Sequence, residues 1–429
     1  MKQVDILEDL YSTIKRDKQI WKFCFYGFFK NLRFFEPYLY IYFLSLGFSL
    51  FQIGILYSIR EITVYILEIP TGIFADNYGK KKSLLICFSS YIVSFILFFY
   101  TKHFLMAAIG MIIFALGEVF RSGTHKAMIY SYLERRGWFS EKTFVYGRTR
   151  SFSLLGSSVA AFLSIFFVLN IPAMKWIFII TIVPYILDFI LILSYPDYLD
   201  ERTESNLSVK RFFISSIEKM KSIFGNGFLT RVLISSSLYD GLFKTIKDYI
   251  QPLMKALIIS SGLVLIKNLP QNSNVKVILG IIYGIFYIFS SSASRNVFRL
   301  NRYIDSFSLM NLLFDLMGVI FVILFFTIKL NWIWVVIALY FLLYLMKDAR
   351  RPLVVDVCGD HMNKNERATV LSVDSQFRSI AMIIFAPLFG FVSDRYSIAV
   401  AFLITGIFIL IVNLFLKGGV KFNKKYKFK

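Results

Sequence analysis

Three ionisable residues, Glu118, Arg121 and His125, lie three and four positions apart within one apolar stretch of the chain. If that stretch is an α-helix, this spacing brings all three side chains to one face. A carboxylate beside a cationic group in a poorly solvated place changes its affinity for protons when the neighbour moves or a ligand binds. The pattern therefore points to proton binding, with His125 as either a proton relay or a hydrogen-bonded packing residue.

Ionisable residues also occur in other apolar stretches, where each costs about 2.5–3.5 kcal/mol on insertion scales and is usually paired or turned toward water. We predict that three of the acids bind protons, namely Glu36, Glu118 and Asp240. Five basic residues in the same kind of stretch are candidates for binding an anionic group or for neutralising these acids, namely Arg33, Arg121, His125, Lys244 and Lys247. The alternative interpretation is that such residues form internal ion pairs that only hold helices together.

Two further groups have simpler interpretations. Asp374 and Arg378 lie four residues apart, which favours a structural ion pair within one helix. Arg350 and Arg351 lie toward one end of their apolar stretch, where basic residues set the orientation of a membrane helix. We therefore expect Arg350 and Arg351 to be topology signals and not site residues.

The composition places all these residues in an all-α integral membrane protein. Of the 429 residues, 57% are hydrophobic and 17% are charged, and the mean hydropathy is +0.64. Apolar stretches of about 17–25 residues or more, long enough to cross a hydrocarbon core of about 30 Å, recur along the whole chain. We predict twelve transmembrane helices, at about 21–46, 52–75, 83–99, 105–130, 151–168, 176–195, 228–258, 277–294, 307–328, 333–356, 369–390 and 399–416.

The longest inner connection divides these helices into two groups of six. Residues 1–195 are expected to form an N-terminal six-helix bundle with a retained amphipathic N-terminal segment. Residues 196–227 are expected to be a cytoplasmic linker, and residues 228–429 a second bundle with a basic cytoplasmic tail. Within the linker, residues 209–223 form either an amphipathic helix on the inner leaflet or a solvated connection.

The net charge of +21 is compatible with nucleic acid, an acidic membrane surface or membrane topology. The distribution of lysine and arginine favours membrane topology as the explanation, because the predicted outer loops contain few of them and the inner loops and tails contain many. The outer ones are Lys102, Lys175, Lys267, Lys276, Lys329 and Arg395. We therefore predict cytoplasmic termini and no nucleic-acid partner. Cys24, Cys87 and Cys358 are too widely spaced for a disulfide framework or a metal knuckle, and we expect no metal and no cofactor.

The connection between the second and third predicted helices reads GIFADNYGKKK, starting at Gly72. A glycine at position 72 permits close approach of a neighbouring helix, and Gly79 permits a turn. Asp76 lies at a helix end, where it can accept hydrogen bonds or face the positive N-terminus of another helix. This segment resembles the G-x-x-x-D-x-x-G-[RK]-[RK] loop signature of the major facilitator superfamily, and it stands at the place where that family carries it.

The resemblance implies two pseudo-symmetric six-helix halves that work by alternating access. It also implies that the first, fourth, seventh and tenth helices line a central cavity. The first, fourth and seventh of these contain the proton-binding candidates and the five basic candidates, so the resemblance implies that these residues face a substrate cavity. The loop is expected to act as a cytoplasmic latch through Gly72, Asp76, Gly79, Lys80 and Lys81. The corresponding second-half loop, SSSASRNVFRLNR, keeps basic residues but neither the acid nor the glycines.

We expect a secondary active transporter of the cytoplasmic membrane, acting as a monomer on a small-molecule substrate and protons. The first hypothesis is proton-coupled efflux of an amphiphilic or drug-like molecule, because Glu36 matches an acid in the first helix of such relatives. The fifth span lacks the G-P-x-x-G pattern of drug antiporters, so proton-coupled transport of a small organic anion or metabolite is the alternative. A transport-dead sensor or a membrane-embedded enzyme is the remaining class. The chain has no paired histidines, phosphate loop or serine elbow to favour an enzyme.

Overall fold

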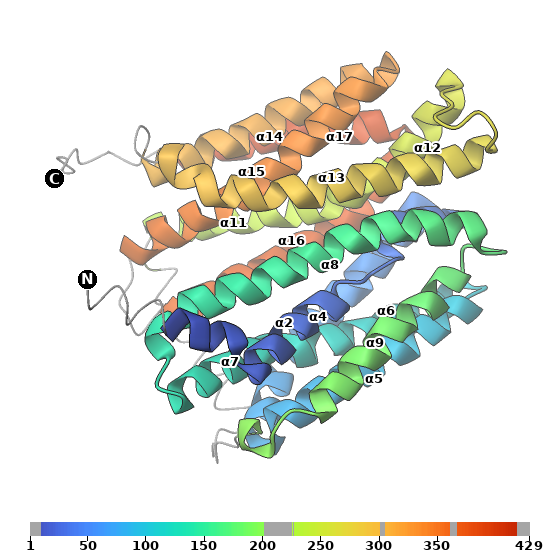
Figure 1. The fold of residues 1–429 in the computed structure, drawn as a ribbon. Helices are drawn as coiled ribbons and strands as arrows, with labels where there is room; N and C mark the ends of the chain where they lie inside the picture. The colour runs from blue at the N-terminus through green and yellow to red at the C-terminus, as the bar shows by residue number, and fades with distance from the viewer. Residues whose placement is uncertain (1–9, 201–224, 226, 301–304, 361–366, 418–429) are drawn as a thin grey trace. The chain divides into compact units, whose positions relative to one another are not determined.

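A computed structural model describes residues 10–200, 225, 227–300, 305–360 and 367–417 of the chain (Figure 1). Within these ranges the regular structure is entirely α-helix and short 3-10 helix. Each of the twelve predicted spans is helical, so the prediction of an all-α membrane protein is confirmed. Most of the linker, the first nine residues, the basic tail and the side chains of the second-half loop lie outside the described residues.

The first half contains six spans, of which the first and the fourth are built from more than one helix. The α-helices are α2 (Lys18–Lys30), α3 (Leu39–Ser45), α4 (Leu50–Tyr78), α5 (Lys80–Tyr100), α6 (Phe104–Arg121), α7 (Thr124–Arg135), α8 (Lys142–Asn170) and α9 (Trp176–Leu193). The 3-10 helices are η1 (Glu36–Tyr38), η2 (Phe139–Glu141) and η3 (Asp197–Leu199).

The second half repeats this order, with a seventh span in two pieces. Its α-helices are α11 (Gly227–Ile246), α12 (Ile250–Ser261), α13 (Gln271–Leu300), α14 (Ser306–Lys329), α15 (Ile333–Asp360), α16 (Arg367–Arg395) and α17 (Ile398–Lys417). The 3-10 helix η4 (Lys247–Tyr249) joins α11 to α12. Among the described residues, 9 helical segments are long and apolar enough to cross a membrane by length and composition. The other spans, the first, seventh and tenth, are broken or carry several charges.

Proline and asparagine explain the break in the first span. The Asn31 side-chain amide donates to the Gly27 carbonyl at 2.6 Å and ends α2. Pro37 lacks an N–H group and crowds the carbonyl four residues earlier, so the helix does not continue through Arg33. In the seventh span, the 3-10 helix η4 interrupts the α-helix just before Pro252, which lies in the first turn of α12. Both predicted continuous helices are therefore interrupted in mid-span.

The chain forms two compact units, each assembled from two separate segments. Unit 1 joins residues 1–212 with residues 248–291, and unit 2 joins residues 213–247 with residues 292–429. In unit 1, α5 packs on α6 and α9, α4 packs on α6, and α2 packs on α8. The packing of α2 on α8 needs a glycine, because a Cβ on Gly156 would lie 2.4 Å from the Phe28 carbonyl oxygen. In unit 2, α14 packs on α17 and α11 packs on α16.

Candidate functional site

The break in the first span places Arg33 and Glu36 outside regular α-helix. Arg33 lies in the connection between α2 and η1, and Glu36 begins η1 directly before Pro37. Both side chains are half-buried, and Arg33 interacts electrostatically with Glu36 and Glu118. The base and the acid of the first span therefore lie close together in sequence at an unwound segment, and their predicted roles in substrate and proton binding stay predictions. Discontinuous membrane helices of this kind recur at substrate and ion sites of transporters.

Gln251 ties this segment to the seventh span within unit 1. Its side chain is fully buried, its Nε2 donates to the Glu36 carbonyl at 3.0 Å, and its Oε1 accepts from the Tyr40 N–H at 2.9 Å. Gln251 precedes Pro252 just as Glu36 precedes Pro37. Sequence reasoning missed Gln251 because it considered only ionisable residues, although the residue–proline repeat was available as a signal.

Tyrosines and a further acid extend the same group of side chains. The Tyr283 hydroxyl donates to Asp248 Oδ1 at 2.8 Å and accepts from Gln251 Nε2 at 3.0 Å. Tyr57 interacts with Asp248, and Tyr287 interacts with the side chain of Glu36. The first, second, seventh and eighth spans therefore all contribute to one hydrogen-bonded polar region in unit 1.

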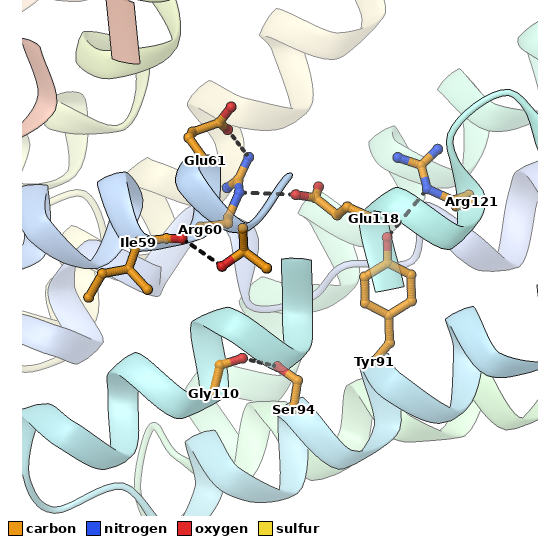
Figure 2. Close-up of polar contacts among 9 residues, drawn as sticks. Ile59, Arg60, Glu61, Tyr91, Ser94, Gly110, Glu118 and Arg121 are labelled. Atoms are coloured by element: carbon orange, nitrogen blue, oxygen red, sulfur yellow. Dashed lines mark hydrogen bonds and ion pairs between the residues drawn. The ribbon is translucent and has the colours of Figure 1, made fainter. Parts of the chain in front are cut away.

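An ion pair between the second and fourth spans adjoins this region. Arg60 Nε lies 3.0 Å from Glu118 Oε2, and Arg60 NH2 lies 3.2 Å from Glu61 Oε1 (Figure 2). The side chains of Arg60 and Glu118 keep 18% and 17% of their surface accessible, whereas Glu61 keeps 3%. Glu118 is thus the partner of Arg60 that water can reach more readily.

The expectation that Glu118, Arg121 and His125 share one helical face is wrong for His125, which lies beyond a break in the helix. The fourth span stops at Arg121 and restarts at Thr124, because Ser122 is extended and Gly123 has φ +74°. Glu118 turns to Arg60, whereas Arg121 Nε donates to the Tyr91 hydroxyl at 3.3 Å (Figure 2). The three residues therefore have three different sets of partners.

His125 belongs to an aromatic cluster at the start of α7. Its ring stacks on Tyr26 with centroids 3.6 Å apart and planes 9° apart, and its Nε2 lies 3.4 Å from the Tyr195 hydroxyl. Phe23 meets the same imidazole edge-on at 5.4 Å. The His125 ring is therefore packed between aromatic rings and also lies within hydrogen-bonding distance of a hydroxyl.

The candidates of the seventh span, Asp240, Lys244 and Lys247, lie in unit 2. Asp240 Oδ2 accepts from Arg378 NH1 at 3.3 Å, linking α11 to α16. Asp374, which we expected to be the partner of Arg378, interacts electrostatically with it and also accepts from the Ser237 hydroxyl at 3.2 Å. Lys244 and Lys247 are half-buried at the end of α11 and the start of η4. Glu36 and Glu118 belong to unit 1, and Asp240 belongs to unit 2.

Arg350 is not the topology signal that we expected. Its side chain is only 1% exposed, and it donates to the Ser235 hydroxyl at 2.8 Å and the Met310 carbonyl at 3.2 Å. The guanidinium lies 4.4 Å from the ring of Tyr239, a residue of α11. Arg350 therefore holds α11, α14 and α15 together inside unit 2. Its position in the chain alone had suggested an exposed helix end.

The loop motif packs against the start of the linker. Gly79 has φ +109°, and a Cβ there would lie 2.3 Å from Asp200 Oδ1. Asp200 accepts from the Lys81 N–H at 2.7 Å, which caps the N-terminus of α5. The Lys81 ammonium donates to the Tyr195 carbonyl at 2.7 Å and pairs with Asp197 at 3.1 Å.

The other motif residues make fewer contacts within unit 1. Lys80 Nζ donates to the Ser131 hydroxyl at 3.3 Å, and Asp76 is exposed on the last turn of α4. Within its own unit, a Cβ on Gly72 meets no atom within 4 Å. The predicted latch function of this loop stays a prediction, whereas Asp197 and Asp200 are partners that sequence reasoning missed.

Candidate metal ligands are scattered in the part of the chain that the structure describes. No three histidine, cysteine, aspartate or glutamate side chains lie close enough there to share a metal ion. Cys24, Cys87 and Cys358 are buried free thiols.

Known proteins resemble this chain over most of its length. The chain is 22% identical to an uncharacterized MFS-type transporter, YxaM, of Bacillus subtilis (strain 168), over 385 residues that cover 88% of this chain and 89% of that protein.

Solved transporter structures share the fold at low sequence identity. The nucleoside transporter NupG superposes with a TM-score of 0.75 at 13% identity and covers 95% of this chain and 100% of its own. A D-xylose-proton symporter superposes with a TM-score of 0.67 at 12% identity, covering 93% and 96%. The family model described as Major Facilitator Superfamily matches residues 22–372. The chain is therefore a multi-pass membrane transporter that belongs to the major facilitator superfamily.

Proposed function

We propose that this transporter couples the movement of a small polar metabolite to protons, working by alternating access in the cytoplasmic membrane with both termini in the cytoplasm. The observation that carries the proposal is the Arg60–Glu118 ion pair of 3.0 Å beside the unwound first span. A carboxylate held by a cation releases its proton easily, and it takes a proton when the pair separates. Movement of the second span against the fourth would therefore change the proton occupancy of Glu118.

The charge balance of the polar region supports proton binding. Its acids are Glu36, Glu61, Glu118 and Asp248, and its bases are Arg33 and Arg60. Because acids exceed bases, a proton or a cationic group is favoured there over an anion. A small organic anion would have to be carried together with protons.

The neutral groups of the region suit a substrate with hydroxyl or amide groups. Tyr57, Tyr283, Tyr287 and Gln251 offer donors and acceptors next to the acids. One structural neighbour is a D-xylose-proton symporter and another a nucleoside transporter, and both names describe polar substrates. We therefore place this chain's substrate among small polar metabolites.

Alternating access requires that contacts across the unwound segments break and reform. We assign the hydrogen bonds of Gln251 to Glu36 and Tyr40 to a state in which the transporter is closed on one side of the membrane. We assign the loop around Gly79 and Lys81 to control of the cytoplasmic side, where Asp200 holds it in place.

Efflux of an amphiphilic, drug-like molecule is the second candidate. It is favoured by the aromatic rings near Glu36, since Tyr40 lies 5.4 Å from Tyr57 and 5.2 Å from Tyr249, measured between ring centroids. Such rings would hold an apolar cation beside the acids.

A screen of thermal stability with purified protein separates these candidates. Sugars, nucleosides, amino acids, organic acids and lipophilic cations are added singly, and the hits are then tested in vesicles with an imposed pH gradient. We expect a polar metabolite to raise the melting temperature and to accumulate only with the gradient. Accumulation of every stabilising compound without any pH gradient would contradict proton coupling, and stabilisation by lipophilic cations alone would favour efflux.

A further inference from the structure

A second group of ionisable side chains lies in the interior of the first-half bundle, and the proposed function does not use it. Its centre is Asp188 on α9, whose side chain is 0% exposed. The nearest charge is the ammonium of Lys30, at the end of α2. Lys30 and Asp188 were not among the predicted site residues.

Asp188 lacks the hydrogen bonds that a buried carboxylate requires. Neither of its oxygens receives a hydrogen bond of ordinary geometry from the described residues, although the Lys30 backbone amide and ammonium are its closest polar neighbours. The Tyr26 hydroxyl, 2% exposed, is likewise without a partner in the described part of the chain. An unsatisfied buried carboxylate is costly, and protonation removes most of that cost.

Charged and titratable groups from several helices lie around Lys30 and Asp188. Lys30 interacts electrostatically with Arg33, Arg121 and Arg150 as well as with Asp188. The uncharged titratable groups that interact with Asp188 are Tyr26 from α2, Cys87 from α5 and Tyr195, whereas Tyr91 and Tyr185 interact with Arg33 and Arg121. The charge on Asp188 therefore depends on its burial and on how close Lys30 lies.

His125 and Tyr195 are polar groups of the same bundle. Tyr195 interacts electrostatically with Asp188, and its hydroxyl lies 3.4 Å from His125 Nε2. The stacked Tyr26 ring fixes the imidazole beside Tyr195.

We propose that Asp188 is a second proton-binding site of the transporter, located inside the first-half bundle and controlled by Lys30. The inference deepens the proposed proton coupling and rests on it for its role in transport. Because Lys30 ends α2 next to the unwound segment, movement of the first span would move the cation away from the acid. Whether Asp188 holds a proton would then depend on the position of the first span.

Infrared difference spectra of the purified full-length protein in lipid, taken between acidic and alkaline buffer, test the site without any substrate. We expect Asp188→Asn to remove one titrating carboxylic-acid band, whereas Asp394→Asn, at an exposed position of α16, keeps it. Superimposable spectra of the wild type and Asp188→Asn would overturn the proposal.

A second pair of variants covers the case that Asp188→Asn does not fold. Lys30→Met should shift the pH midpoint of this band, and Lys22→Met, on the same helix, should not. Equal midpoints in Lys30→Met and the wild type would also overturn the proposal. If wild-type vesicles move no protons with substrate, proton coupling fails, but the spectra still decide whether Asp188 binds a proton.

Discussion

The side-chain amide of Gln251 donates a hydrogen bond to the backbone carbonyl of Glu36 at 3.0 Å, and each of these residues directly precedes a proline. Each stands where a membrane-spanning helix is interrupted, one in the first span and one in the seventh. The first carries an acid and the second a neutral amide, so of this pair only Glu36 can change charge.

Gln251→Ala should loosen the contact between the first and seventh spans, because it removes three buried hydrogen bonds of Gln251. Spin labels at the exposed Ser45 and Lys267, both in unit 1, report this contact as a distance distribution. We expect one short distance in the parent protein and an added longer population in Gln251→Ala. Gln271→Ala serves as the control, because its side chain bonds only α12 carbonyls. An unchanged distribution in Gln251→Ala would remove this residue from gating.

Gly79→Ala should lower the free energy of unfolding by about 1–3 kcal/mol, since the residue has φ +109° and its new Cβ would strike Asp200. Gly147→Ala, in α8, is the matched control, because a Cβ there meets no atom within 4 Å. Thermal unfolding in detergent compares the two. Equal melting temperatures would show that the loop does not depend on the contact with Asp200.

Arg350→Lys should destabilise the protein by about 1–3 kcal/mol, although it keeps the charge. A lysine cannot reach both the Ser235 hydroxyl and the Met310 carbonyl while lying flat on Tyr239. Arg395→Lys, at an exposed position on the last turn of α16, should change stability little. A melting temperature of Arg350→Lys equal to that of Arg395→Lys would favour our original interpretation as a topology signal.

Span number and helix type were predictable from the sequence, because hydrophobic length is set by the membrane and is local in the chain. The interruptions were harder to predict. Pro37 and Pro252 were visible, but a proline within a membrane helix is often tolerated, as Pro184 in α9 shows. The first span is interrupted because Pro37 acts together with the Asn31 cap at the end of α2.

Ion-pair partners could not be predicted, because they depend on how helices rotate against each other. Spacing suggested that Asp374 pairs with Arg378, yet Arg378 also forms an ion pair with Asp240 on another helix. Spacing placed Glu118, Arg121 and His125 on one face, but the Gly123 break separates His125 from the other two, and Glu118 and Arg121 bond side chains of different spans. The choice of Glu118 and Asp240 as important acids remains a prediction about function.

The central claim is that Glu118 exchanges protons as substrate moves. Vesicles that contain the transporter and a trapped pH indicator measure this directly when a substrate from the thermal screen is added outside. We expect a change of luminal pH with the wild type and with Glu134→Gln, a control at an exposed position of α7. In Glu118→Gln the pH response should fall at least about tenfold, in keeping with loss of a coupling group, while downhill substrate movement continues. Substrate accumulation with constant luminal pH in the wild type, or a full pH response in Glu118→Gln, would contradict the account.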